Sequence, residues 1–365
     1  MSVESTHIFY IAIIVFATLF AEISNRIKND TSIKIRFKNA VFCIERPKAM
    51  VFLAVSFFIV FLPLAVRNCG MDLKMYYIMY TRNGYETYDY LYFFLCKIIY
   101  YFTEDPKTGM AVIGFITLFI IYYVGFKLRK QLYYPLFFMG YFMVLYFYTY
   151  NYIRMMLAAS IVILGYKFIL EEKRTKAIFT FLIAIGFHFS AICVLTFYLL
   201  IVYFIKYRRL IIGGMLIVLW IFLQNANYFF EQIKFGRYLD MIKSIDYEGV
   251  SIGIGTTIKM VPLIIILFLF KHTFTDNKKL YNLFCFFTLY NVVISFVGYY
   301  EAIASRMANM YLVFSTLFLV PYIIQHEKRK KTKLFVLKIG YVFFCAFLYY
   351  QVLGNFRIMK ILPYY

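Results

Sequence analysis

Long apolar runs dominate the chain, and short polar stretches separate them. Residues 52–66 read FLAVSFFIVFLPLAV and residues 110–126 read MAVIGFITLFIIYYVGF. A transmembrane helix needs about 20 mostly apolar residues, whereas a strand of a membrane barrel shows about ten residues of alternating polarity. The pattern therefore predicts membrane helices. We expect them at residues 8–24, 50–66, 110–126, 132–149, 155–170, 210–226, 257–271, 280–298, 307–324 and 334–353.

Lysine and arginine concentrate in six clusters between these helices, at residues 26–48, 127–130, 173–176, 206–209, 271–279 and 328–333. Because basic residues favour cytoplasmic loops, we expect all six clusters in the cytoplasm and both chain termini outside it. Two longer extracytoplasmic loops remain, at 67–109 and 227–256, and each is expected to carry interfacial helices.

The segment 177–205 does not fit a simple alternation of sides. Both of its flanks are basic, yet its length is too short for two crossings at about 20 residues each. We expect a pair of short helices that enters from the cytoplasm and turns inside the protein, with Gly186 and His188 at the tip. The alternative is one long tilted helix, which would invert every later loop.

Composition supports a single integral membrane domain over residues 1–365. Hydrophobic residues make up 63% of the chain, charged residues 16%, and the mean hydropathy is +0.74. Soluble domains have roughly 45–50% apolar and about 25% charged residues, so a soluble fold is excluded. We expect an all-α polytopic membrane protein with about 12 transmembrane or re-entrant helices. The formal net charge of +21 is accounted for by membrane topology, and no nucleic-acid partner is expected.

Ionisable residues at membrane depth are costly and tend to line substrate paths or to pair with one another. Most of those in this chain fall at the predicted outer ends of helices, and His188 would reach that side through the re-entrant pair. The set comprises Arg67, Asp72, Arg154, His188, Glu301 and Arg306, and the polar residue Asn151 stands close to Arg154 in the sequence. For each of them a plain interfacial, core or helix-end role is a competing interpretation. The sequence contains no metal-ligand or nucleotide-binding motif, so neither a metal nor another cofactor is expected.

Several segments resemble, in order, the motifs of the EpsG family. RNCGMDLKMYY resembles its R-x-x-G-x-D-x-x-x-Y segment, NYIRMMLAA its (N/F)-x-x-R-Q-x-(L/I)-A segment, and FLIAIGFHFSAI its (I/L)-A-x-x-F-H-x-S-A segment. SRMANMYLVF and the closing LPYY match later segments more loosely. The resemblance covers roughly residues 50 to 365, and Met155 departs from it where the family often has Gln.

The resemblance implies a Wzy-like polysaccharide polymerase with a GT-C-like fold in the bacterial cytoplasmic (inner) membrane. Such an enzyme transfers a glycan from polyprenyl diphosphate to another lipid-linked repeat unit at the outer leaflet, without a metal. Its partners would be the polyprenyl-diphosphate-linked oligosaccharide, membrane lipid and a chain-length regulator protein. Carried over by position, Arg67, Asp72, Arg154, His188 and Arg306 form the functional set.

In the resulting hypothesis, Arg154 and Arg306, with Arg67, hold the leaving diphosphate, and Asn151 and Glu301 contribute to substrate binding. His188 or Asp72 is the general base on the acceptor hydroxyl. Two other functions stay open at this point. A lipid-linked oligosaccharide flippase or exporter also needs a cationic cavity, and a membrane O-acyltransferase also needs a histidine.

Overall fold

The computed structural model shows a helical protein with one short β-hairpin. It describes residues 3–27, 33–37, 40–44, 46–81, 89–204, 214, 259–297, 307–327 and 331–358. The expected helices at 8–24, 50–66 and 110–126 lie within α1 (Val3–Arg26), α2 (Pro47–Val66) and α5 (Pro106–Lys127). The expected helix at 210–226 and the loop at 227–256 lie outside the described residues.

Six helices within the described ranges are long and apolar enough to cross a membrane, which identifies a multi-pass membrane protein. They are Ser5–Arg26, Pro47–Val66, Pro106–Lys127, Ile153–Leu170, Met307–His326 and Lys331–Gln351. The chain divides into two compact units. The first comprises Met1–Ile192 and Thr316–Tyr365, and the second comprises Cys193–Ser315.

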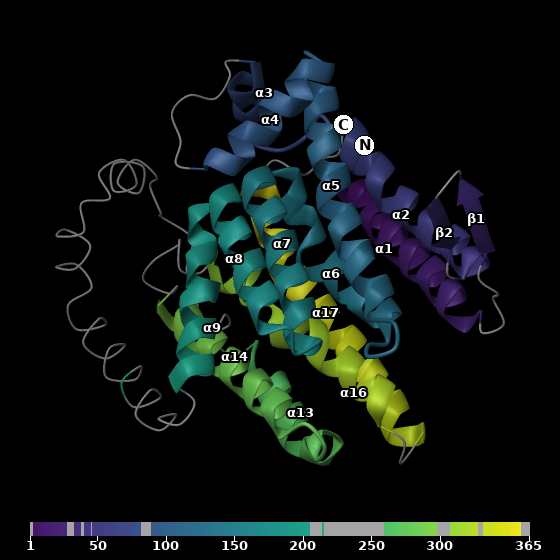
Figure 1. Cartoon of the computed structure of the whole chain (residues 1–365), viewed down its shortest axis with the longest axis vertical. Coiled ribbons are helices and arrows are strands. Elements are labelled where there is room, and N and C mark those ends of the chain that lie inside the picture. The colour runs from purple at the N-terminus through teal and green to yellow at the C-terminus, as the bar shows by residue number, and fades with distance from the viewer. Residues whose placement is uncertain are drawn as a thin grey trace. The chain divides into compact units, whose positions relative to one another are not determined.

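The first unit is built around α7 (Ile153–Leu170), whose side chains are almost all buried. A helix that is apolar on every side belongs in the interior of a bundle, and α7 packs against α5 and α8 (Arg174–Phe187). Around these, α1 packs on α2 and on α6 (Tyr134–Val144), while α2 packs on α5. The C-terminal helices α16 (Val320–His326) and α17 (Lys331–Ile358) pack on each other and on α6 (Figure 1).

Two features of this unit depart from the simple helix pattern. The expected helix at 132–149 ends early as α6 and continues as a 3-10 turn, η1 (Tyr146–Tyr150). Between α1 and α2, an antiparallel hairpin pairs β1 (Ile33–Phe37) with β2 (Ala40–Ile44). The alternation of apolar and basic residues in IKIRF is typical of a strand, although its basic residues also make it part of the predicted cytoplasmic cluster at 26–48.

The loop predicted at 67–109 contains two short helices, α3 (Leu73–Thr81) and α4 (Tyr90–Phe102), and the first residues of α5. Both short helices contact α5, and α4 also contacts α8, so they cover one end of the bundle (Figure 1).

The predicted break in 177–205 is confirmed at His188. There α8 ends and a single 3-10 turn, η2 (Phe189–Ala191), leads into α9 (Ile192–Phe204).

Most of α9 belongs to the second unit, together with α13 (Val261–Leu269), the 3-10 turn η4 (Lys271–Phe274) and α14 (Lys278–Val297). The Met307–His326 segment begins in this unit and is irregular at Leu312 and Val313. A π-helical turn, η5 (Ser315–Leu319), follows where the chain returns to the first unit.

Candidate functional site

A buried carboxylate, Asp89, joins two of the residues that the sequence singles out. Its Oδ2 atom lies 2.9 Å from Nη1 of Arg154 and 3.1 Å from Nδ1 of His188. The backbone N–H of Phe189 donates to the other carboxylate oxygen, Oδ1, at 3.2 Å. Three chain segments therefore meet on one side chain: the residue before α4, the first turn of α7 and the end of α8.

The local structure explains why these groups meet. Asp89 occupies the N-cap position of α4, but its side chain accepts no capping hydrogen bond from that helix. Its carboxylate thus remains available to other donors. His188 follows the last residue of α8 in an extended conformation, and the N–H of the next residue is then free to turn toward Asp89.

A glycine sets the distance between α8 and α4 next to this cluster. A Cβ atom added at Gly186 would lie 2.5 Å from Cδ1 and 2.7 Å from Cγ of Leu91. Real Cβ atoms do not approach so closely, so a larger residue would require the Leu91 side chain or the spacing of the two helices to shift. Leu91 is two residues from Asp89, and Gly186 is two residues from His188, so this contact lies next to the carboxylate and the imidazole.

The cluster is mostly shielded from solvent. The side chain of Asp89 is 7% exposed, and those of Arg154 and His188 are each 17% exposed. Burial by itself would raise the pKa of the Asp89 carboxyl, but the hydrogen bond and charge of His188 and the charge of Arg154 hold this pKa below its ordinary value. Asp89 is therefore ionised at neutral pH. An ionised carboxylate only accepts hydrogen bonds, so Nδ1 of His188 must carry a proton.

Aromatic rings surround the arginine of this cluster. The guanidinium carbon of Arg154 lies 5.7 Å from the ring centre of Tyr76 and 5.9 Å from that of Tyr92. Both tyrosines are buried, at the start of α3 and of α4. A guanidinium held over ring faces keeps its charge in a mainly apolar setting, so α3 and α4 fix the position of Arg154 from the side opposite to α7.

A second group of predicted residues assembles where the chain leaves α2. Arg67 is 3% exposed, its Nη1 donates to the carbonyl oxygen of Leu64 at 2.5 Å, and its guanidinium lies 5.5 Å from the ring centre of Tyr150. The Nε atom of Arg67 is buried and has no hydrogen-bond partner. No ion pair to Arg67 is found within the part of the chain that the structure describes.

The Gly70 position explains how this turn packs. Gly70 has φ +120°, a conformation that favours glycine, and an added Cβ would lie 2.5 Å from the backbone oxygen of Tyr150. Two residues later, Asp72 is held by Asn151: the N–H of Asp72 donates to Oδ1 of Asn151 at 2.9 Å, and Nδ2 of Asn151 donates to the carboxylate at 3.2 Å. The turn at residues 67–72 therefore packs against Tyr150 and is hydrogen-bonded to Asn151, the first residue of the NYIR segment.

The structure thus places the predicted residues in two groups linked through residues 150–154. Arg154 and His188 meet through Asp89, while Arg67, Asp72 and Asn151 gather around Tyr150. Glu301 and Arg306 lie outside the described residues. Asp89 is absent from the sequence-based set, because it stands in the polar stretch NGYETYDY, where an acidic residue is normally solvated. Its position directly before an apolar helix was the only available signal.

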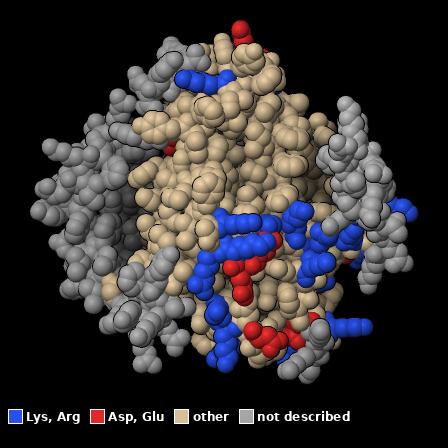
Figure 2. Space-filling model, in the orientation of Figure 1, with Lys and Arg blue, Asp and Glu red and all other residues tan. Residues whose placement is uncertain are grey.

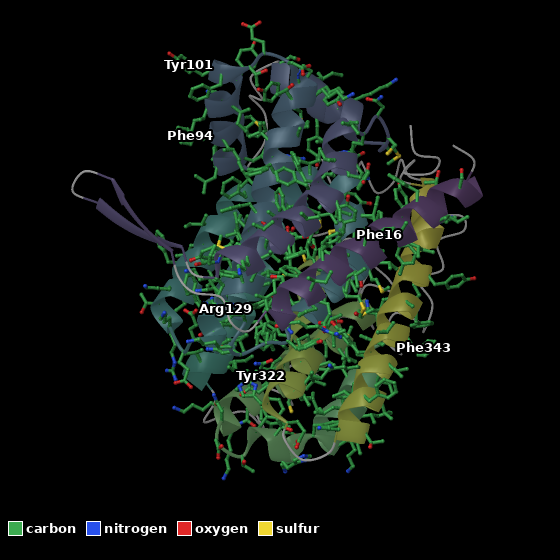
Figure 3. The ribbon with its side chains drawn as sticks, turned by 90° about the vertical axis from the view of Figure 1, so that its right-hand side faces the viewer. Phe16, Phe94, Tyr101, Arg129, Tyr322 and Phe343 are labelled. Carbon is green, nitrogen blue, oxygen red and sulfur yellow. The ribbon has the colours of Figure 1, made fainter. Side chains whose placement is uncertain are left out.

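Arg154 opens α7, whereas Lys167 lies near its end, about 20 Å further along at 1.5 Å per residue. Figure 2 shows that most of the basic side chains on its face gather away from the end that carries α3 and α4. In Figure 3, Phe94 and Tyr101 of α4 lie at that end, far from Arg129.

The described residues contain no group of three His, Cys, Asp or Glu side chains placed to hold a metal ion. The assembled groups are fixed cations, one oriented imidazole and two carboxylates. Such a set can bind an anionic leaving group and accept a proton.

These features define a multi-pass helical membrane protein with a buried carboxylate that connects an arginine and a histidine. Residues 49–365 match the model of the EpsG family, so the chain belongs to that family. Membership indicates a membrane protein of the polysaccharide-polymerase type. No curated protein and no solved structure gives a significant match.

Proposed function

We propose that this protein is a glycosyltransferase that polymerises lipid-linked repeat units at the outer face of the bacterial cytoplasmic membrane. It transfers a glycan from polyprenyl diphosphate to the acceptor hydroxyl of a second lipid-linked repeat. The observation that carries the proposal is the Oδ2 atom of Asp89, which is shared by Arg154 and His188 in a member of the EpsG family. Positively charged loops favour the cytoplasm, and the cluster lies at the opposite end of α7, which supports an outer-face site.

His188 is the general base in this proposal. Its Nδ1 proton is directed at Asp89, so the lone pair of Nε2 is available for the acceptor hydroxyl. The negative charge of Asp89 stabilises the imidazolium that forms when the proton arrives. Asp72 is the weaker candidate for the base, because its carboxylate and its backbone N–H are already engaged by Asn151. Asp72 and Asn151 then position the turn that carries Arg67.

The leaving diphosphate is bound by arginines. Arg67 is the strongest candidate among the described residues, since it is buried and forms no ion pair there. Arg154 forms an ion pair with Asp89 through its Nη1 atom. A guanidinium group has five N–H donors in all, so one side chain can contact both a carboxylate and a phosphate. Arg306 is assigned from the sequence and the family resemblance, and it lies outside the described residues.

The proposed step is balanced without an added reagent. The acceptor oxygen forms a bond to the anomeric carbon of the donor glycan as the bond from that carbon to the diphosphate oxygen breaks. The acceptor proton moves to Nε2 of His188, and the electron pair leaves with polyprenyl diphosphate. Cations fixed where the diphosphate charge develops are expected to be the largest catalytic contribution, and the base adds about 10²–10⁴-fold.

The test is polymerisation by the purified protein with a defined lipid-linked repeat unit as the sole substrate. The wild-type protein should give a ladder of polymer lengths, and Arg154→Ala and His188→Gln should give none at equal protein levels. If both variants still make full-length chains, the site is wrong. A deletion strain tests the reaction class: loss of a polymerase leaves single repeat units on the final carrier, loss of a flippase leaves none outside, and loss of an acyltransferase leaves normal chain lengths.

A further inference from the structure

The second unit contains a buried lysine that the mechanism above does not use. Lys259 lies just before α13 and is 5% exposed, and its ammonium donates a hydrogen bond to the Oδ1 atom of Asn309. An ammonium has three donors and carries a full charge, whereas an amide oxygen supplies one neutral acceptor. Within the described part of the chain, no Asp or Glu forms an ion pair with Lys259.

A buried charge that no described carboxylate neutralises is costly, because the ion has lost its hydration. Its neighbours in the sequence, Met260 and Leu263, are buried and apolar. Proteins retain such groups where a ligand supplies the opposite charge. The ligand must therefore be an anion.

The backbone beside Lys259 is also unusual. Asn309 lies three residues before the irregular residues Leu312 and Val313. From α14, Nδ2 of Asn291 donates to the carbonyl oxygens of Ala308, at 2.9 Å, and Leu312, at 2.8 Å. Irregular backbone in a membrane segment is tolerated where it is buried in protein or lines a cavity. Here the side chain of Asn291 holds the irregular segment through both hydrogen bonds.

An apolar face begins at the same point. Val261, Ile265 and Phe268 of α13 are all exposed, and their spacing places them on one side of the helix. The basic residues Lys278 and Lys279 follow the far end of α13, so the rule that places basic loops in the cytoplasm assigns Lys259 to the outer end. An anion that reaches Lys259 along this face must itself be attached to an apolar chain.

We infer that Lys259 and Asn309 bind the phosphate group of a polyprenyl diphosphate, with its isoprenoid chain along Val261, Ile265 and Phe268 of α13. This inference rests on the proposed function, which supplies that lipid as donor, acceptor and product. It adds a lipid-phosphate contact in the second unit to the arginines of the first.

The experiment measures binding of polyprenyl diphosphate to the full-length protein in nanodiscs of zwitterionic phospholipid. The variants are Lys259→Met and Lys259→Arg, and the matched control is Lys278→Met, which removes an exposed lysine from the same unit. Lys259→Met should weaken binding about 10- to 100-fold, as expected for the loss of a hydrogen bond to a charged group. Lys259→Arg should retain most of the affinity, and Lys278→Met should leave it unchanged.

A second measurement separates a ligand site from a structural lysine. Because no described carboxylate neutralises Lys259, the inference predicts that Lys259→Met raises the melting temperature of the lipid-free protein by a few degrees. A structural lysine would give a lower melting temperature instead. Unchanged affinity in Lys259→Met, or a lower melting temperature of the lipid-free Lys259→Met protein, would overturn the inference.

Two further outcomes are informative. If phosphatidylglycerol displaces the probe at equal membrane fraction in the wild-type protein but not in Lys259→Met, the bound lipid is an ordinary phospholipid and the inference fails. If the wild-type protein binds polyprenyl diphosphate through Lys259 but makes no polymer, the proposed function fails while this site stands. If the wild-type protein polymerises and Lys259→Met binds equally well, only the lysine site fails.

Discussion

Replacing Asp89 by asparagine tests the central feature of the site, because it keeps the side-chain shape and removes the charge. The carboxylate receives three donors: Nη1 of Arg154 at 2.9 Å, Nδ1 of His188 at 3.1 Å and the N–H of Phe189 at 3.2 Å. An amide has one acceptor oxygen. If the amide oxygen keeps the hydrogen bond from the N–H of Phe189, the amide NH₂ group faces the N–H donors of Arg154 and His188. If the oxygen instead turns toward those two donors, the hydrogen bond from Phe189 is lost.

The expected effect on rate follows from the histidine tautomer. With an NH₂ group facing it, the imidazole gains a hydrogen bond only if Nδ1 becomes the acceptor and the proton moves to Nε2. The base is then blocked, which should lower kcat by about 10²–10⁴-fold. A matching change in a serine protease triad lowers kcat by about 10⁴-fold for the same reason. KM should change little, because Asp89 acts through His188 and does not contact the substrate.

The expected effect on stability is smaller. Each hydrogen bond to a charged group contributes about 1.5–3 kcal/mol, and this site is shielded but not fully buried, so we expect a loss of about 2–3 kcal/mol. The sign of the pH dependence follows from the lowered pKa of Asp89. The stabilisation should be fully present above the ordinary value of 3.8 and should be lost as the pH falls through the lower value of the folded protein.

The assay is single-turnover polymerisation with a lipid-linked repeat, combined with thermal unfolding from neutral pH to below pH 4. Asp105→Asn is the matched control, since Asp105 is an exposed N-cap carboxylate on α5 and an asparagine can still cap that helix. Asp89→Asn protein that folds and polymerises within about threefold of the wild-type rate would refute the assigned role of the carboxylate.

Three further predictions concern how the site is held. Gly70→Ala should destabilise the protein by at least about 1–3 kcal/mol, since its φ is strained for alanine and the Tyr150 backbone blocks the Cβ; denaturant unfolding in detergent measures this. Gly186→Ala should displace α4 from α8 at Leu91 and lower kcat while leaving lipid binding intact. Initial rates over a series of substrate concentrations measure this, and an unchanged kcat would contradict it. Arg67→Lys should weaken diphosphate binding despite the conserved charge, because an ammonium cannot reproduce a bidentate contact; equal affinity in a titration would argue against it.

The helices could be predicted from the sequence because apolar length alone determines them. The expected run at 110–126 is the interior of α5, which continues to Pro106 and Lys127 at its two ends. Interruptions were harder to predict. The break at His188 followed from counting residues between two basic flanks, whereas the change from α6 to the η1 turn occurs inside an unbroken aromatic run and carries no sequence signal.

The membership of the site could be predicted only in part, and Asp89 shows why. Ionisable residues attract notice when they interrupt an apolar run, as Arg154 and His188 do. Asp89 stands in a polar loop and becomes buried only because α7 begins and α8 ends beside it. Its burial is a tertiary property, since both side chains that contact it, Arg154 and His188, are far from it in the sequence.

Asp89, which the sequence did not single out, changes the expected charge balance of the site. Without Asp89, Arg154 and His188 would form a pair with no carboxylate beside it, suited to holding an anion but with nothing to orient the imidazole as a base. With Asp89, one carboxylate offsets the arginine and orients the imidazole, and the uncompensated positive charge among the described residues shifts to Arg67. In the proposed mechanism, proton transfer and diphosphate binding are therefore assigned to different side chains. A transporter of the same lipid would need only the second of these, so the intact Asp89–His188 contact favours the enzyme over the exporter.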